Sequence, residues 1–100
     1  MPEALILEFD GVDDEQYRAV NERLGIDPVS GRGDWPDGMV SHTGAAKSGG
    51  LVVFEVWDSK DAQERFMNER LGKALQEGGV TSPPTRVEWL AVAGYSTPGG

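Results

Sequence analysis

Residues 51–58 (LVVFEVWD) form an almost continuous run of apolar, β-branched and aromatic side chains, which is typical of a strand buried at the centre of a sheet. A helical pattern follows directly, because the next apolar side chains recur on one broad face while most charged side chains lie away from it. Asp58 or Ser59 can cap the start of this helix, and Gly78 with Gly79 can end it. The pattern therefore predicts a central strand that leads into an amphipathic helix.

A second strand and helix are predicted near the amino terminus. Apolar side chains alternate along residues 3–10 (EALILEFD), which indicates a strand with its leucines and its phenylalanine on one face. Asp13 and Gln16 have the spacing of a capping box, in which each side chain bonds the other residue's backbone N–H at a helix start. The helix is expected over residues 14–24, and Gly25 ends it.

Two further strands complete the predicted set. Residues 39–46 (MVSHTGAA) have a weaker strand pattern, and residues 85–95 form the last strand after two prolines that prevent a helix from continuing. Residues 26–38 form a long connection rich in Gly, Pro and Asp that contains Trp35. A loop of this length in a small domain is typically either functional or disordered. Because it contains an indole that needs burial, we expect it to act as a lid.

Residues 47–50 (KSGG) are expected to connect two of these strands as a hairpin. A symmetric loop of two or four residues places His42 opposite Glu55 and Val40 opposite Trp57. A three-residue bulged loop would shift the register by one residue and separate His42 from Glu55. Both registers are open on the sequence alone.

The order strand, helix, strand, strand, helix, strand predicts an α+β fold of the ferredoxin-like βαββαβ type. A four-stranded antiparallel sheet would carry both helices on one face. The other face would expose Ile6, Leu51, Val53 and Trp57, an apolar area larger than a monomer in water normally tolerates. We therefore expect a homodimer that buries this face.

Composition narrows the classes of function. A chain of 100 residues suits a single domain over residues 1–96, with a flexible tail at residues 97–100. Seventeen acidic against nine basic residues give a formal net charge of −8, which disfavours a nucleic-acid partner. Cysteine is absent, which excludes disulfides and thiolate metal sites. No long apolar run is present, so no membrane partner is expected and the default location is cytoplasmic.

The hairpin register makes His42 and Glu55 the candidate catalytic pair, in which the carboxylate orients an imidazole that moves a proton. The alternative is a surface or interface histidine without a chemical role. Trp35 and Trp57 are candidates to bind a small aromatic ligand in an apolar pocket. Glu8 is a further binding candidate, which would act as an acid if enclosed with Glu55 and be a solvated charge if the site is open. A single His with scattered carboxylates is too poor a set for a closed zinc site, so no metal is expected.

Three segments carry a resemblance to a known superfamily: WPDGMVSHTGAA at residues 35–46, GGLVVFEVWDSKDAQERF at residues 49–66 and RLGKALQEGG at residues 70–79. With them, the whole chain resembles the dimeric α/β-barrel superfamily, in particular small proteins related to antibiotic biosynthesis monooxygenases. The resemblance implies two ferredoxin-like subunits with their sheets face to face, the helices outside, and a cavity between sheet and helices or within the barrel. Activities in the superfamily include cofactor-independent oxygenation, polyketide cyclisation and haem degradation, and some members have no known activity.

The haem-degrading branch has an Asn on the first strand and a His on the second helix. This chain has Glu8 and Asp10 on the first strand and no His in the second helix, so that branch is disfavoured and no cofactor is expected. The resemblance then implies a cofactor-independent monooxygenase or a cyclase that acts on an aromatic or polyketide-like substrate. The alternative is a non-catalytic dimer that binds a small ligand or has a structural role.

Overall fold

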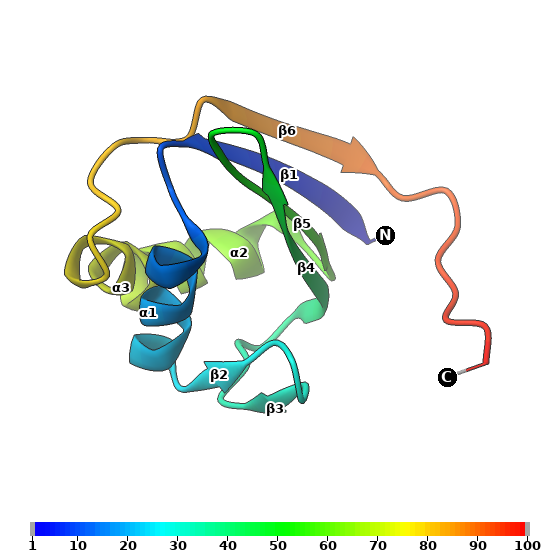
Figure 1. The fold of residues 1–100 in the computed structure, drawn as a ribbon. Helices are drawn as coiled ribbons and strands as arrows, with labels where there is room; N and C mark the ends of the chain where they lie inside the picture. The colour runs from blue at the N-terminus through cyan, green and yellow to red at the C-terminus, as the bar shows by residue number, and fades with distance from the viewer. Residues whose placement is uncertain (1, 100) are drawn as a thin grey trace.

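The structure is a computed structural model that describes residues 2–99, in which helices cover one face of a four-stranded antiparallel sheet (Figure 1). The strands lie in the order β4-β5-β1-β6, with bounds β1 (Glu3–Asp10), β4 (Met39–Lys47), β5 (Gly50–Trp57) and β6 (Arg86–Ala91). The covering helices are α1 (Asp14–Leu24) and, in one continuous run, α2 (Lys60–Phe66), η1 (Met67–Leu71) and α3 (Gly72–Glu77). A separate short hairpin consists of β2 (Ile26–Asp27) and β3 (Arg32–Gly33). The predicted α+β class and βαββαβ order of the sheet are confirmed.

Helix α1 begins and ends where the sequence predicts. The Asp13 side chain accepts from the backbone N–H of Gln16 at 2.8 Å, and the Gln16 side chain accepts from the backbone N–H of Asp13 at 3.0 Å. Gly25 ends the helix with φ 74°, a left-handed conformation that a residue without a Cβ adopts at little cost. These two ends fix which side chains of α1 face the sheet, among them the buried Val20 and Leu24.

The second helix contains a π-helical segment, η1, which the sequence pattern does not predict. The backbone N–H of Gly72 donates to the carbonyl of Met67, five residues back instead of four. Gly72 suits this turn, because a Cβ at its position would lie only 3.1 Å from the Met67 oxygen. Met67, Leu71 and Gly72 line a cavity between the helices and the sheet, so the wider turn forms part of the cavity wall.

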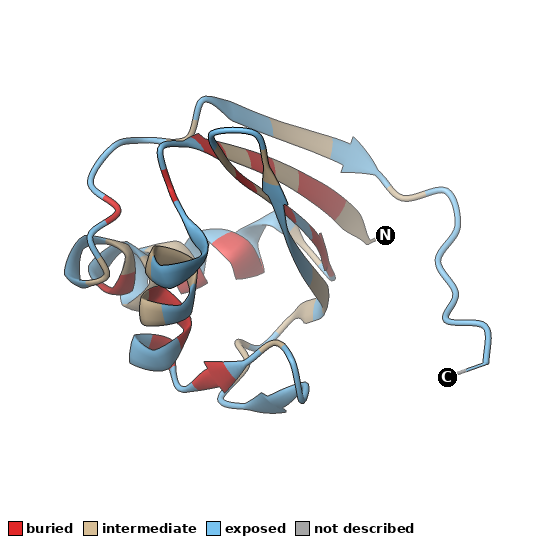
Figure 2. Ribbon diagram, in the orientation of Figure 1, coloured by how far each residue is buried: buried red, intermediate tan, exposed pale blue. Residues whose placement is uncertain are grey.

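The core lies between the helices and the inner face of the sheet (Figure 2). Direct pairing of Leu5 with Glu55 and of Leu7 with Val53 places these four side chains on that face. Leu5 and Trp57 are 1% and 0% exposed, and they belong to the same cluster as the buried residues of the helices. Burial of apolar surface here stabilises the fold by about 25 cal/mol per Å².

The prediction that Leu51, Val53 and Trp57 lie on the uncovered face was wrong, because all three pack against the helices. Alternating apolar and polar residues show which side chains of one strand share a face. They do not show which of the two faces meets the helices, because that depends on the register between strands that are distant in the sequence. Only Ile6 of the predicted set lies on the uncovered face.

The uncovered face has an apolar half and a charged half. Ile6 pairs with Phe54, which is 41% exposed, and Leu90 is 42% exposed on the edge strand β6. Pairing of Leu5 with Trp89 settles the facing of β6, with Trp89 toward the helices and Leu90 on the uncovered face. The charged half consists of Glu8, Asp10, Lys47, Arg86 and Glu88.

The β4–β5 hairpin has the register predicted from a symmetric loop. Ser48 and Gly49 form the connection, and His42 pairs directly with Glu55. Gly49 has φ 75°, which a tight hairpin turn requires of at least one of its residues. The local turn therefore decides the pairing of two residues that are candidates for chemistry.

The predicted pairing of Val40 with Trp57 was wrong. A bulge at Val40 places Met39 opposite Trp57 and Ser41 opposite the preceding residue of β5. The irregularity lies at the end of β4 that is remote from the hairpin loop, so it leaves the register at His42 unchanged.

Beyond β6 the chain continues through residues 92–99 without a helix or strand (Figure 1). The domain limits at residues 1–96 and the flexible tail at residues 97–100 stay predictions. Residues 1 and 100 lie outside the described part of the chain.

Candidate functional site

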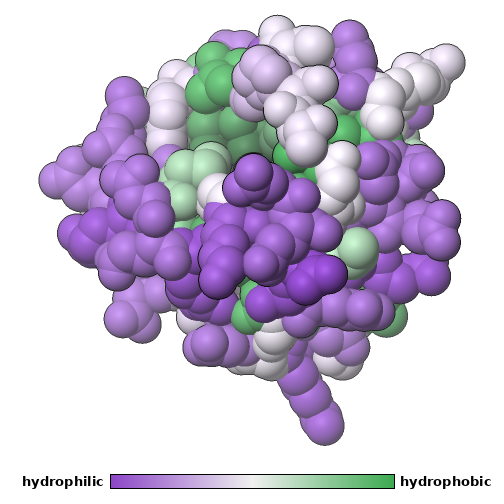
Figure 3. All heavy atoms as spheres, turned by 90° about the vertical axis from the view of Figure 1, so that its left-hand side faces the viewer, coloured by the Kyte–Doolittle hydropathy of each residue, from purple (hydrophilic) through white to green (hydrophobic). Residues whose placement is uncertain are grey.

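A cavity of about 500 Å³ lies between the inner face of the sheet and the helices. Its wall is mostly apolar and includes Leu7, Phe9, Leu24, Val53, Leu71 and Leu75. On the side of the molecule where α1 and α3 lie, hydrophobic side chains are visible in a recess among hydrophilic ones (Figure 3). Ligand sites in proteins are typically clefts of about 300–1,000 Å³ with a mostly apolar lining and a few polar groups. This cavity therefore suits a small apolar molecule.

A chain of hydrogen bonds runs along one wall of the cavity. The Tyr17 hydroxyl lies 2.6 Å from Nε2 of His42, and Nδ1 of His42 lies 2.7 Å from Oε2 of Glu55. The other carboxylate oxygen, Oε1, accepts a 3.0 Å hydrogen bond from the indole N–H of Trp57. Tyr17, His42 and Glu55 line the cavity, whereas Trp57 has no exposed surface and contacts the carboxylate from within the core.

One placement of protons satisfies every atom in this chain. An indole N–H can only donate, and an ionised carboxylate can only accept, so Glu55 accepts from Trp57 at one oxygen and from Nδ1–H of His42 at the other. With a neutral imidazole, Nε2 of His42 then accepts from the phenol of Tyr17. Burial raises the pKa of Tyr17. The neighbouring Asn21 side chain partly opposes this rise, and the charge of Glu55 adds to it. The phenol therefore keeps its proton.

The local sequence brings Tyr17 to His42 in two ways. Tyr17 lies in the first turns of α1, whose start is set by the cap at Asp13, and its ring stacks on that of His42 with centroids 6.0 Å apart. Gly44 follows His42 by two residues on the same face of β4, and a Cβ at Gly44 would collide with the Tyr17 hydroxyl. The absent side chain lets the phenol approach the strand.

Trp35 is a second aromatic neighbour of His42, with ring centroids 5.6 Å apart and planes tilted by 48°. Arg70 of η1 donates a 2.8 Å hydrogen bond to the carbonyl of Asp34, next to Trp35, and so ties this loop to the second helix. Residues 26–38 therefore contain the β2–β3 hairpin and an anchored indole, where the sequence predicted an irregular loop. Movement of this segment as a lid stays a prediction.

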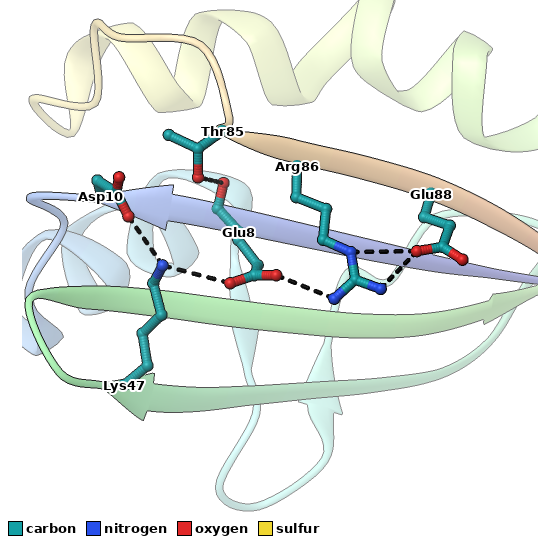
Figure 4. Close-up of polar contacts among 6 residues, drawn as sticks. All are labelled: Glu8, Asp10, Lys47, Thr85, Arg86 and Glu88. Carbon is teal, nitrogen blue, oxygen red and sulfur yellow. Dashed lines mark hydrogen bonds and ion pairs between the residues drawn. The ribbon is translucent and has the colours of Figure 1, made fainter.

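Glu8 lies on the uncovered face of the sheet, so the structure does not bring it to the cavity. Its carboxylate contacts Arg86 at 3.0 Å and Lys47 at 3.3 Å, in a cluster that includes Asp10 and Glu88 (Figure 4). The hydrogen bond from Arg86, followed by that from Lys47, lowers the pKa of Glu8 below its ordinary value of 4.5. Glu8 and Glu55 lie on opposite faces of the sheet, so the two carboxylates do not share one enclosure, and the role of Glu8 as an acid or in ligand binding stays a prediction.

The structure brings together four of the five site residues that the sequence predicts. His42 and Glu55 lie on the cavity wall, Trp35 contacts the His42 ring, and Trp57 holds the Glu55 carboxylate from the core. Glu8 is the exception. The roles of these residues in catalysis or ligand binding stay predictions.

Tyr17 and Asn21 also line the cavity, and the sequence pattern does not predict a functional role for either residue. The apolar periodicity of α1 assigns Tyr17 to the core stripe, where its hydroxyl still needs a hydrogen-bond partner. That need, and the presence of an amide in an otherwise apolar stripe at Asn21, are the signals that could have pointed to a polar site under α1.

Across residues 2–99, no group of three or more His, Cys, Asp or Glu side chains is placed to hold a metal ion. Within the same range, no helix combines the length and the apolar character needed to cross a membrane.

The fold and the site define a class of molecule: a ferredoxin-like α+β protein with an apolar cavity beneath the sheet and a Tyr–His–Glu hydrogen-bonded chain on the cavity wall. No protein-family model matches the sequence, and no curated protein matches it. Solved structures do match, over nearly the whole chain.

One is a candidate antibiotic biosynthesis monooxygenase from Chloroflexus aurantiacus, with a TM-score of 0.70, 13% identity, and coverage of 97% of this chain and 98% of that chain. Another is Rv0793 from Mycobacterium tuberculosis, with a TM-score of 0.65, 22% identity, and coverage of 97% and 100%. A third is the ActVA-Orf6 monooxygenase of Streptomyces coelicolor in complex with nanaomycin D, with a TM-score of 0.53, 23% identity, and coverage of 97% and 90%. At these identities the likeness shows a shared fold. The resemblance to antibiotic biosynthesis monooxygenase-like proteins is confirmed at that level.

Proposed function

We propose that this protein binds a small aromatic or polyketide-like molecule in the cavity and removes a proton from it. The observation that carries the proposal is the hydrogen-bonded chain of Tyr17, His42 and Glu55 on the wall of an otherwise apolar cavity. A few convergent polar groups in a water-poor, apolar cavity are the usual composition of a site for small-molecule chemistry.

Tyr17 is the group that meets the ligand, because both ring nitrogens of His42 are already hydrogen-bonded. The phenol accepts a proton from the ligand as it passes its own proton to Nε2 of His42, so the raised pKa of Tyr17 does not prevent the transfer. Glu55 holds Nδ1–H and stabilises the imidazolium that results. Trp57 fixes the orientation of the carboxylate through its other oxygen.

Cofactor-independent oxygenation fits this arrangement. Removal of a proton from an activated methylene group leaves a carbanion that reduces dioxygen. One oxygen atom stays as a new carbonyl and the other leaves as water, so the substrate supplies all the electrons. In a cyclase, the same carbanion would attack a carbonyl carbon of its own molecule. The proposal draws support from structural neighbours described as monooxygenases, one of them in complex with nanaomycin D.

Oxygen uptake with an anthrone tests the proposal, because an anthrone carries an acidic methylene group between aromatic rings. We expect His42→Gln to lower the rate of quinone formation by about 10²–10⁴-fold, the usual contribution of a positioned general base. Arg18→Gln is the matched control, since this exposed side chain bonds Asp14 on the outer side of α1, and it should keep the wild-type rate.

Equal rates for the wild-type protein and His42→Gln would refute a catalytic role for the hydrogen-bonded chain of Tyr17, His42 and Glu55. Binding of the anthrone without any oxygen uptake, in the presence of an intact fold, would favour a non-catalytic ligand-binding protein. Absence of both binding and turnover would remove the basis of the proposal.

We also propose that two copies associate through the uncovered face of the sheet. Phe54 and Leu90 expose apolar surface there, next to Ile6, and the helices lie on the opposite face and cannot cover it. A two-fold related copy would present the same apolar half, bordered by the charged half around Glu8.

Sedimentation equilibrium at micromolar concentration tests this association. We expect a dimer for the wild-type protein and a folded monomer for Phe54→Asp, which places a charge in the proposed interface. Val29→Asp is the control, because Val29 is 96% exposed in the β2–β3 hairpin, and it should remain a dimer. A monomeric wild-type protein would contradict the proposal.

A further inference from the structure

Asn21 is the unusual polar residue of the cavity. It lies on α1, lines the cavity and is only 5% exposed. Its side-chain nitrogen Nδ2 is buried and makes no hydrogen bond of ordinary geometry to residues 2–99, although the side chain lies near enough to the Tyr17 hydroxyl to lower the pKa of that phenol. A buried amide without a partner lowers the stability of the folded protein, because it loses its hydrogen bonds to water without replacement. Such a group in the wall of a cavity needs an explanation.

Asn21 lies next to the hydrogen-bonded chain of Tyr17, His42 and Glu55. Asn21 follows Tyr17 by four residues on α1, so the two side chains share one face of the helix, one turn apart. The Asn21 side chain is close enough to the Tyr17 phenol to lower its pKa, but Nδ2 makes no hydrogen bond of ordinary geometry there. A ligand oxygen bound at Nδ2 would therefore hold the neighbouring part of the ligand at the Tyr17 hydroxyl.

The remaining lining limits the charge of the ligand. Within the described residues, the cavity wall contains one ionisable carboxylate, Glu55, and neither Lys nor Arg. A carboxylate or phosphate ligand would meet a buried negative charge with no cation to balance it. An uncharged acceptor, in contrast, would satisfy Nδ2 at no such cost.

We propose that Asn21 is a specificity-determining residue that donates a hydrogen bond from Nδ2 to a carbonyl oxygen of an uncharged, apolar, ring-containing ligand. The inference rests on the proposed function, since it assigns the ligand class of the same cavity. It predicts that ring ketones and quinones bind more tightly than hydrocarbons of the same shape or carboxylates of similar size.

Fluorenone and fluorene form a matched pair of probes, because they share their rings and differ in a carbonyl against a methylene group. Equilibrium dialysis measures the affinity of each compound for the wild-type protein and for Asn21→Leu. The ratio of these two affinities does not depend on how well the compound dissolves in water. We expect Asn21→Leu to weaken fluorenone binding by about five- to tenfold, the effect of one net hydrogen bond, and to leave fluorene binding unchanged or tighter. Fluorene-9-carboxylate should bind the wild-type protein more weakly than either probe.

Thermal unfolding of the free proteins separates a ligand-binding role from a structural one. Asn21→Leu removes an unpaired amide and keeps a similar volume, so the melting temperature should stay the same or rise. Gln63→Leu is the matched control, a buried helical amide outside the cavity lining, and it should not change the ratio of fluorenone to fluorene affinity.

Three outcomes would overturn the inference. Equal fluorenone affinity in the wild-type protein and Asn21→Leu would show that Nδ2 does not bind the carbonyl, while leaving the proposed function standing. A clear fall in the melting temperature of Asn21→Leu, without a change in fluorenone preference, would assign the amide to the fold. Failure of both probes to bind the wild-type protein would refute the ligand-binding cavity itself, and the inference with it.

Discussion

Two glutamates on opposite faces of the sheet have very different surroundings. Glu55 on β5 is 5% exposed, and its oxygens accept from the indole of Trp57 and the imidazole of His42. Glu8 on β1 has 24% of its side-chain surface exposed, and its oxygens contact the cations Arg86 and Lys47. The first carboxylate belongs to a buried chain that ends at a cavity. The second belongs to an exposed cluster of ion pairs (Figure 4).

The two faces of the sheet hold a glutamate carboxylate with different kinds of partner. On the covered face, donors with fixed ring geometry hold the carboxylate, and removal of one hydrogen bond leaves a buried group without a partner. On the uncovered face, flexible cations hold it, and water and salt screen the attraction. The carboxylate of Glu55 is therefore held in one orientation more strongly than the carboxylate of Glu8. This favours Glu55 as the residue that can position a reacting group.

Glu55→Gln gives the largest expected effect in this comparison. Glutamine has one acceptor oxygen where two donors approach, so either the Trp57 or the His42 N–H loses its partner in the core. We expect a loss of about 2–3 kcal/mol in the free energy of unfolding, measured by urea denaturation. Glu8→Gln, with its partners at the surface, should lose less. Equal losses at the two positions would mean that burial does not distinguish them.

Tyr17→Phe should have an intermediate effect that sharpens the proton assignment. The change removes the donor to Nε2 of His42 and leaves the ring stacked, so we expect a loss of about 1 kcal/mol in the free energy of unfolding. Nitrogen-15 NMR of the imidazole should show a proton on Nδ1 in the wild-type protein and a shifted Nε2 resonance in Tyr17→Phe. A wild-type tautomer with its proton on Nε2 would contradict proton transfer from Tyr17 to His42.

The smallest expected effect is the pH dependence of the ion pairs at Glu8. The folded-state pKa of Glu8 lies below the ordinary value of 4.5, because of Arg86 first and Lys47 second. Its stabilisation is therefore complete above that ordinary value and is lost as the pH falls through the folded-state pKa. The difference in urea midpoint between the wild-type protein and Glu8→Gln should be present at about pH 7 and shrink at about pH 3.

High salt provides the second check on Glu8. Because the cluster is partly exposed, about 1 M NaCl should reduce the same difference at neutral pH. A difference that grows in acid would contradict stabilisation by the ionised Glu8 carboxylate and would assign it to another group.

Much of the fold could be predicted because its signals are local. The capping box at Asp13 and the stop at Gly25 define α1, and the symmetric turn after Lys47 sets His42 opposite Glu55. Each of these involves residues close in the chain, whose geometry is determined by backbone hydrogen bonds and by the conformations that glycine permits.

The candidate site could be predicted only in part, for the same reason. The His42–Glu55 pair follows from a hairpin, but the contact of Tyr17 with His42 depends on how α1 packs on the sheet, and on the missing side chain at Gly44. The placement of Trp57 in the core also depends on the register of β5 with β1.

The sequence by itself determined the order of the elements and the ends of α1, and it left two registers open for the β4–β5 hairpin. Only the tertiary structure decided which face of β5 meets the helices, that Glu8 is separated from Glu55 by the sheet, and that Asn21 lies unpaired in the cavity wall. The physical reason is the range of the interactions. Caps and turns are satisfied within a few residues, whereas sheet register and helix packing are chosen by the burial of side chains from the whole chain.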